Sequence, residues 1–271
     1  MKHTIKKLIK DFTPPLIWRA ISRIRHHHIE QTFWCPVCNQ KVKQFSKLPD
    51  YYNDMMEKYE YIHSIYCTET INSKAYSCPH CYASDRDRLY AIYFNKRFQS
   101  DKKKEYAFLD IAPSKPLADF VRKHDFIRYR SADLYMEDVD DKVDITDMYI
   151  YPENNFDIIL CSHVLEHIEN DRKAMSELYR ILKPGGFAIV MVPILLTLNE
   201  DFENSAYTTE AERWKYFGQN DHVRLYSKSG FLNKLSQTGF KTSQLGIEYF
   251  GKDVFETNGI HPRSILYIVE K

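Results

Sequence analysis

The chain has 271 residues, 44% of them hydrophobic, which is enough to bury one full core with a smaller part appended. A formal net charge of +1 provides no overall field for binding nucleic acid. No stretch is apolar enough to span a membrane or to serve as a secretion signal, so we expect a cytoplasmic protein with reduced thiols. All eight glycines lie at or after Gly185, which excludes a glycine-rich phosphate loop before that point.

The first segment, residues 1–33, mixes apolar residues at helical spacing with lysines and arginines, and Pro14-Pro15 divides it. The pattern predicts a basic amphipathic arm. Such an arm could rest on an anionic membrane surface. We favour the simpler interpretation, in which it is a helical arm that packs on the rest of the protein.

Two C-P-x-C pairs stand in the next segment, Cys35 with Cys38 and Cys78 with Cys81. Each pair can present two thiolates to one ion, and four sulfurs complete a tetrahedral structural zinc site. Iron is not excluded, and unligated core cysteines are the alternative. The pattern predicts a zinc knuckle module over residues 34–101, with a helical insertion near residues 51–66.

A helix is predicted directly after the second knuckle, with Ser84 as its N-cap. Its first turn carries Arg86 and Arg88. Both could clamp an anionic group of a substrate, because the guanidinium fork suits phosphate and carboxylate. A solvated or salt-bridged start of the helix explains the same residues equally well.

The remaining sequence alternates strands and helices. Buried strands are expected at residues 106–111, 126–129, 156–162 and 187–192. Asn170 caps a helix that Pro184-Gly185-Gly186 stops, and this strand–helix–strand unit predicts a right-handed parallel crossover. A further helix over residues 227–238 ends at Gly239, and residues 241–249 and 264–269 supply a final antiparallel pair.

The run D-I-I-L-C-S-H-V-L-E-H-I, followed by E-L-Y-R-I-L-K-P-G-G, resembles class I S-adenosylmethionine-dependent methyltransferases. It is most similar to the small-molecule group that includes the quinone-biosynthesis methyltransferases. The C-P-x-C pairs and the acidic-Arg-x-Arg helix start resemble a bacterial subgroup often found among surface-polysaccharide genes. The resemblance implies a doubly wound, mainly parallel, seven-stranded Rossmann-like sheet in a methyltransferase domain at residues 102–271. It also implies O-methylation of a sugar, glycan precursor or other small-molecule acceptor.

The same resemblance implies which residues bind the cofactor, S-adenosylmethionine. The turn after the first strand carries Ala112-Pro113 in place of the usual glycines, and we expect neither to adopt a positive φ angle. Asp133 stands where a carboxylate binds the ribose, and Asp144 where one accepts a hydrogen bond from adenine. The full expected set is Asp110, Ala112, Pro113, Asp133, Asp144, Ile145, Ser162 and His163.

For catalysis we nominate His222 as the general base, because its ordinary pKa suits taking a proton from a hydroxyl. Asp221 could orient it. His163 and His167, which flank Glu166 at the end of a strand, are rivals because this end faces the usual ligand crevice. By resemblance, Arg86, Arg88, Arg224 and Tyr226 are the expected substrate-binding residues.

Two other functions are weighed against methyl transfer. The absent glycines could indicate a non-catalytic binding module that docks a partner through its zinc module. Three acidic residues in the expected order argue against it. Methylation of nucleic acid is disfavoured by the near-zero net charge and by the lack of an N-P-P-Y-type motif.

Overall fold

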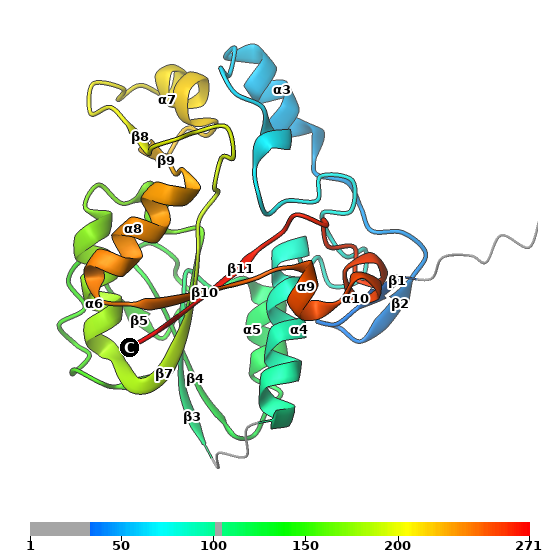
Figure 1. The fold of residues 1–271 in the computed structure, drawn as a ribbon, viewed down its shortest axis with the longest axis vertical. Helices are drawn as coiled ribbons and strands as arrows, with labels where there is room; N and C mark the ends of the chain where they lie inside the picture. Colours follow the sequence, from blue (N-terminus) through cyan, green and yellow to red (C-terminus); the bar gives the residue numbers. More distant parts are fainter. Residues whose placement is uncertain (1–32, 101–104) are drawn as a thin grey trace, which may run out of the picture. The chain divides into compact units, whose positions relative to one another are not determined.

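The computed structural model describes residues 33–100 and 105–271 (Figure 1). The predicted amphipathic arm therefore lies, except for its last residue, outside the described residues. Within them, no helix combines the length and apolar character needed to cross a membrane.

A seven-stranded sheet forms the centre of the molecule, in the order β10-β11-β7-β6-β3-β4-β5 (Figure 1). Its strands are β3 (Tyr106–Ile111), β4 (Ile127–Asp133), β5 (Asp141–Lys142), β6 (Phe156–Ser162), β7 (Leu182–Met191), β10 (Lys241–Leu245) and β11 (Leu266–Glu270). The strands from β5 to β7 pair in parallel, and β11 runs antiparallel to both of its neighbours. The prediction of a doubly wound, mainly parallel sheet is confirmed.

The crossover from β6 to β7 runs through α6 (Asp171–Ile181). The Asn170 side chain accepts a hydrogen bond from the backbone N–H of Lys173, as the N-cap prediction required. The helix ends before the predicted Pro-Gly-Gly stop, because β7 already pairs with β6 at Leu182. Gly185 then takes a φ of 74° at a shift in the strand register, so the Pro-Gly-Gly sequence forms an irregularity inside the strand.

Helices cover both faces of the sheet (Figure 1). On one face lie α4 (Asp85–Ser100) and α5 (Lys115–Val121), and on the other α6 and α8 (Lys228–Thr238). Gly239 ends α8 in the left-handed conformation, as predicted. Two short helices, α9 (Ile247–Phe250) and α10 (Lys252–Thr257), connect the last two strands.

The cysteine-bearing segment consists of β1 (Phe33–Cys35), β2 (Gln40–Val42), α3 (Asp50–Lys58) and the 3-10 helix η1 (Ile65–Cys67). It shares its hydrophobic core with the sheet, and residues 33–271 form one compact unit. Helix α4, expected in this module, packs beside α5 with Leu89 and Phe94 fully buried. The domain boundaries stay predictions.

Above the sheet, α3 contacts α7 (Glu210–Phe217), as the upper part of Figure 1 shows. The ring of Tyr59 stacks on Trp214, with centroids 6.2 Å apart. Lys215 pairs with Glu60 at 2.9 Å. Below α7 in Figure 1 lies the two-stranded pair β8 (Phe202–Glu203) and β9 (Arg224–Leu225), and β9 contacts the 3-10 helix η2 (Leu165–His167). The insertion therefore contacts the segment that follows β7.

Candidate active site

A cavity of about 450 Å³ opens at the carboxyl ends of β3 and β6. The next strand along the chain, β4, pairs with β3 on one side. Strand β6 pairs with β3 on the other side. This arrangement makes the gap between β3 and β6 a topological switch point, where open α/β sheets bind their ligands. The lining residues include Asp110, Ala112, Pro113, Ser114, Leu160 and Ser162. Four of the predicted cofactor residues thus share one cavity.

The turn after β3 corrects one expectation. Ala112 has a φ of 52°, which is the left-handed conformation that we expected only glycine to adopt here. Its N–H donates to the Ala132 carbonyl at 2.9 Å, and this bond to the neighbouring strand holds the turn. The backbone can therefore make the turn of the glycine-rich version at the energetic cost of a left-handed alanine, about 1–2 kcal/mol.

Asp110 lies behind this turn and is 1% exposed. Burial raises the pKa of its carboxyl to about 7, although the Tyr129 hydroxyl donates a hydrogen bond to it at 2.8 Å and opposes the rise. The carboxyl is therefore poised to ionise when a cation approaches. A ligand with an ammonium group satisfies that condition.

The start of α4 forms another wall of this cavity. Ser84 and Asp87 cap the helix reciprocally, since each accepts a hydrogen bond from the other's backbone N–H. The second carboxylate oxygen of Asp87 accepts from the Ser114 hydroxyl at 2.9 Å, and the Tyr90 hydroxyl lies 2.7 Å from that of Ser162. The helix after the second knuckle is thereby bound to the ends of both β3 and β6.

The remaining predicted cofactor residues do not line this cavity as far as the described chain shows. Asp133 ends β4 beside the Ala112 turn, and its carboxylate accepts two backbone N–H groups from Tyr135 and Met136. Asp144 is exposed and accepts from the N–H of Thr146, and Ile145 is buried. Their roles toward ribose and adenine stay predictions.

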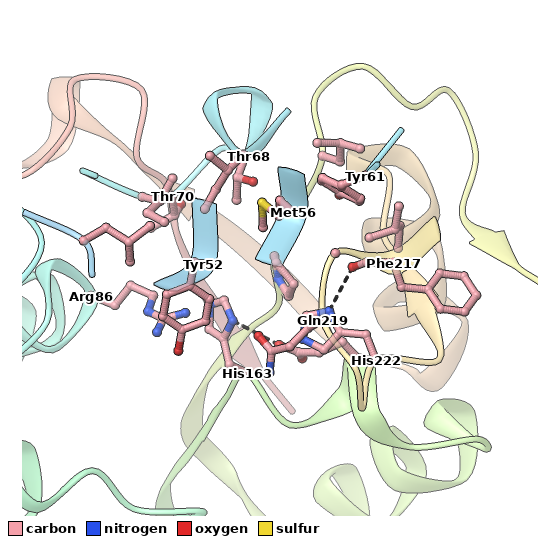
Figure 2. A pocket seen from close by; sticks show the side chains of 18 of the residues that line it. Tyr52, Met56, Tyr61, Thr68, Thr70, Arg86, His163, Phe217, Gln219 and His222 are labelled. Carbon is pink, nitrogen blue, oxygen red and sulfur yellow. Dashed lines mark hydrogen bonds and ion pairs between the residues drawn. The ribbon is translucent and has the colours of Figure 1, made fainter. Parts of the chain in front are cut away.

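A second cavity of about 270 Å³ lies under α3 and α7 (Figure 2). Residues from the insertion form its roof, residues after β6 its floor, and residues after α7 its far wall. Those lining it include Tyr52, Met56, Tyr61, Tyr76, Arg86, His163, Glu166, His167, Phe217, Gln219 and His222. The contribution of Tyr52 and Met56 was missed from the sequence. The aromatic insertion was the available signal, but its contact with α7 joins residues 155 positions apart, as in the pair of Glu60 and Lys215.

The two cavities share Tyr76 and Arg86, and consecutive residues at the end of β6 separate them. Ser162 lines the first cavity and His163 the second. His163 has a φ of 57°, and this turn of the backbone accompanies the change from one cavity to the other. A group bound in the first cavity would therefore meet one bound in the second near Arg86 and His163.

His163 is paired with a buried carboxylate. Its Nδ1 lies 3.0 Å from Oε1 of Glu166, whose side chain is fully buried. Burial and the nearby Arg86 lower the pKa of His163 to about 4, so its imidazole is neutral at pH 7. Burial alone would raise the pKa of Glu166, but His163 and the other two histidines outweigh it and lower that pKa to about 2. In the described part of the chain, Nε2 of His163 is buried without a hydrogen-bond partner.

The other two histidine candidates also lie close to Glu166. The rings of His167 and His222 meet edge to face with centroids 4.8 Å apart. His222 Nδ1 lies 3.3 Å from the Phe217 carbonyl, as the dashed line in Figure 2 shows. His167 Nδ1 lies 3.3 Å from Asp221, so Asp221 orients His167 rather than His222. All three histidines line the second cavity.

Arg86 and Arg88 differ completely in their surroundings. The prediction that Arg88 binds substrate is wrong. Arg88 is fully buried, and its five N–H groups donate to backbone carbonyls of Ala75, Tyr76, Ala83, Asn258 and Gly259. Arg86 instead lines both cavities, and no hydrogen bond or ion pair within the described residues engages its guanidinium.

The predictions that Arg224 and Tyr226 bind substrate are also wrong. Arg224 is 2% exposed and donates to the Leu165 and Glu169 carbonyls, which fixes η2. The Tyr226 hydroxyl donates to Asp171 at 2.6 Å. Both side chains hold the elements under the second cavity and do not line it.

The contrast between the two arginines yields a matched pair of variants. Arg88→Lys is expected to lower the free energy of unfolding by at least about 2 kcal/mol, because three ammonium N–H groups leave buried carbonyls without partners. Arg86→Lys should change it by less than about 1 kcal/mol. Urea unfolding of both variants measures this difference, and equal losses would contradict the assignment.

The four knuckle cysteines converge. Cys35 Sγ lies 3.7 Å from Cys81 Sγ, and Cys38 Sγ lies 3.8 Å from Cys78 Sγ. All four sulfurs lie within 4.8 Å of one another. Four thiolates at about 2.3 Å from a tetrahedral zinc ion would be about 3.8 Å apart, so the residues fit such an ion. Zinc binding stays a proposal that this geometry supports.

The two knuckles repeat one backbone design. The residue after each second cysteine, Asn39 or Tyr82, has a positive φ of 59° or 64°. In each case its N–H donates to the carbonyl of the first cysteine at 2.9 Å. His80, between the cysteines of the second knuckle, is exposed and outside the sulfur cluster.

Cys78→Ser is expected to remove the bound metal and destabilise the protein, because Cys78 is a fully buried member of the cluster. His80→Ala changes the same loop without touching a sulfur and should keep the metal. Elemental analysis of both purified variants tests this. Equal metal content in Cys78→Ser and wild type would refute the four-cysteine site.

Comparison with known proteins agrees with this architecture. A family model described as a methyltransferase domain matches residues 81–245, more than half of the chain. The chain belongs to the methyltransferase domain family. Together with the strand order, the match confirms the predicted class I S-adenosylmethionine-dependent methyltransferase fold.

Curated relatives of this methyltransferase-domain protein include ubiquinone/menaquinone biosynthesis C-methyltransferases. The one from Hydrogenovibrio crunogenus is 46% identical over 41 residues, which is 15% of this chain and 16% of that protein. The one from Citrobacter koseri is 26% identical over 106 residues, 34% of this chain and 41% of that protein. The chain therefore spans less than half the length of these relatives. A methyltransferase structure from Archaeoglobus fulgidus shows 14% identity and a TM-score of 0.43, covering 68% of this chain and 94% of that one.

Proposed function

We propose that this protein transfers a methyl group from S-adenosylmethionine to a hydroxyl of a small-molecule acceptor, such as a sugar or glycan precursor. The observation that carries the proposal is the junction of the two cavities. The switch-point cavity between β3 and β6 adjoins the cavity under α3 and α7, and Arg86 lines both. Two reactants can then meet with little solvent between them.

The cofactor would occupy the switch-point cavity. The residues of this cavity suit the cofactor. Asp110 can ionise and pair with the ammonium group of the cofactor, and the turn at Ala112 lets the backbone come close to it. When bound, S-adenosylmethionine supplies a methyl group activated by a sulfonium. The protein's part is to hold the acceptor in line and to remove one proton.

The acceptor would occupy the second cavity. Arg86 lines it as a half-buried cation without a hydrogen-bonding partner in the described chain, and it can bind a phosphate or carboxylate on the acceptor. Burial tends to lower the pKa of Arg86, but the surrounding acidic and tyrosine groups raise it, so the charge is kept. Around the rest of the cavity, Tyr52, Met56 and Phe217 supply rings and a thioether that exclude water.

We assign the base to His163 rather than to His222. The Glu166 carboxylate beside Nδ1 favours the tautomer with its proton on that nitrogen, and this leaves Nε2 as the acceptor. Nε2 is buried and makes no hydrogen bond to the described residues. His163 also directly follows Ser162, which lines the switch-point cavity. A hydroxyl at this junction would pass its proton to Nε2 as the methyl group arrives.

The names of the curated relatives suggest a second candidate, methylation of carbon. A carbon acceptor would need the same removal of a proton at the same junction. Nuclear magnetic resonance of the isolated product distinguishes an O-methyl from a C-methyl group. Binding of S-adenosylhomocysteine without turnover of any acceptor would favour the non-catalytic module instead.

His163→Gln is expected to lower kcat by about 10²–10⁴-fold, because it removes the proton acceptor. The affinity for S-adenosylhomocysteine, measured by calorimetry, should stay within about twofold of wild type. A panel of sugars, phosphosugars and phenols supplies the acceptor for a labelled-methyl assay. His261→Gln is the matched control, since His261 lies outside both cavities.

The pH dependence follows from the lowered pKa of His163. The neutral, proton-accepting form persists down to about pH 4, so kcat should be flat between about pH 6 and 8 and fall below about pH 5. A rate that rises steeply through pH 6.5 would contradict the assignment, because it would indicate a base with an ordinary histidine pKa.

A further inference from the structure

Glu166, His167 and His222 gather at the floor of the second cavity. One ligand atom from each lies within 4.8 Å of the others. Two imidazoles and one carboxylate are the side-chain types that bind divalent first-row transition metals. These residues stand apart from the four-cysteine cluster and share no residue with it.

The Glu166 carboxylate is the unusual member. The side chain is fully buried, Nδ1 of His163 faces its Oε1 at 3.0 Å, and the described part of the chain supplies no other hydrogen-bond partner to either oxygen. An ionised buried carboxylate that faces only one neutral imidazole still carries a large desolvation cost unless a positive charge compensates it. Arg86 lines the same cavity, but no ion pair joins it to Glu166 among the described residues.

The two histidines are oriented as metal ligands usually are. Nδ1 of His167 faces the Asp221 carboxylate at 3.3 Å, and Nδ1 of His222 faces the Phe217 carbonyl at 3.3 Å. An oxygen acceptor at Nδ1 fixes the proton on that nitrogen and leaves Nε2 with its lone pair. Each ring thus keeps the lone pair of its second nitrogen available for an ion.

The spacing is close to what an ion requires. Bonds of about 2.0–2.2 Å from zinc to nitrogen and oxygen place neighbouring ligand atoms about 3–4 Å apart. The three ligand atoms lie within 4.8 Å, so closure by about 1–2 Å at most forms the site. Small rotations of the half-exposed His167 can supply that movement, since its side chain is 28% exposed.

We infer that Glu166, His167 and His222 bind a divalent transition-metal ion, such as Zn²⁺, Mn²⁺ or Fe²⁺, at the floor of the acceptor cavity. Three protein ligands leave coordination positions open toward the cavity, where oxygen atoms of a bound molecule can reach the ion. Its use in orienting an acceptor rests on the proposed function. The binding of the ion itself does not.

The test counts metal ions and identifies their ligands. Full-length protein is stripped with a chelator, saturated with Co²⁺, freed of excess and analysed for cobalt per chain. Wild type should hold two ions. Thiolate-to-cobalt charge-transfer bands report the cysteine site, and weak d–d bands report the nitrogen and oxygen site.

His167→Asn and Glu166→Gln should each hold one ion and keep the thiolate bands, while His261→Gln should hold two. His167→Asn is the principal variant because His167 is the least buried of the three ligands. His222→Asn provides a second variant should either of the others fail to fold, as judged by circular dichroism. One ion in wild type, or two ions in His167→Asn, overturns the proposal.

The two proposals fail separately. Calorimetric titration of each variant with S-adenosylhomocysteine reports the cofactor site, which contains none of the three metal ligands. Wild type that binds S-adenosylhomocysteine but only one cobalt ion would leave methyl transfer standing and remove the second metal. Two cobalt ions without any binding of S-adenosylhomocysteine would support the second metal site and contradict the proposed methyl transfer.

Discussion

The guanidinium of Arg88 donates every N–H group to a backbone carbonyl, and these carbonyls come from segments far apart in the sequence. They belong to the residues just before the second knuckle, to the residue Ala83 that follows it, and to the end of α10. The ring of Phe45 packs on the same guanidinium at 3.8 Å. This buried cation fixes the first turn of α4. Because that turn is fixed, Arg86, two residues earlier, lies at both cavities. The site depends on this anchor.

The cysteine module is thereby part of the candidate site rather than a separate appendage. It anchors the start of α4 through Arg88, and α4 reaches β3 and β6 through Asp87 and Tyr90. Its insertion roofs the second cavity and stacks on α7 through Tyr59 and Trp214. Loss of an ion from the cysteines would consequently loosen both cavities, although no cysteine lines either one.

Features that short stretches of sequence determine could be predicted. The buried run at β6, the Asn170 cap and the spacing of the cysteines each specify short-range geometry, and the structure has all three. Features set by tertiary packing could not. The local sequence does not indicate which of Arg86 and Arg88 is buried. The left-handed conformation of Ala112 depends on a hydrogen bond to the neighbouring strand. The roles of His167 and Asp221 depend on residues brought together from distant segments.

The central claim is that the gap between β3 and β6 binds S-adenosylmethionine despite its glycine-free turn. Its most direct test is a titration of the purified protein with S-adenosylhomocysteine, followed by thermal unfolding. We predict a saturable rise of the unfolding midpoint, since ligand at 100 times its dissociation constant stabilises a protein by about 2.7 kcal/mol. An unchanged midpoint at millimolar ligand would contradict the account.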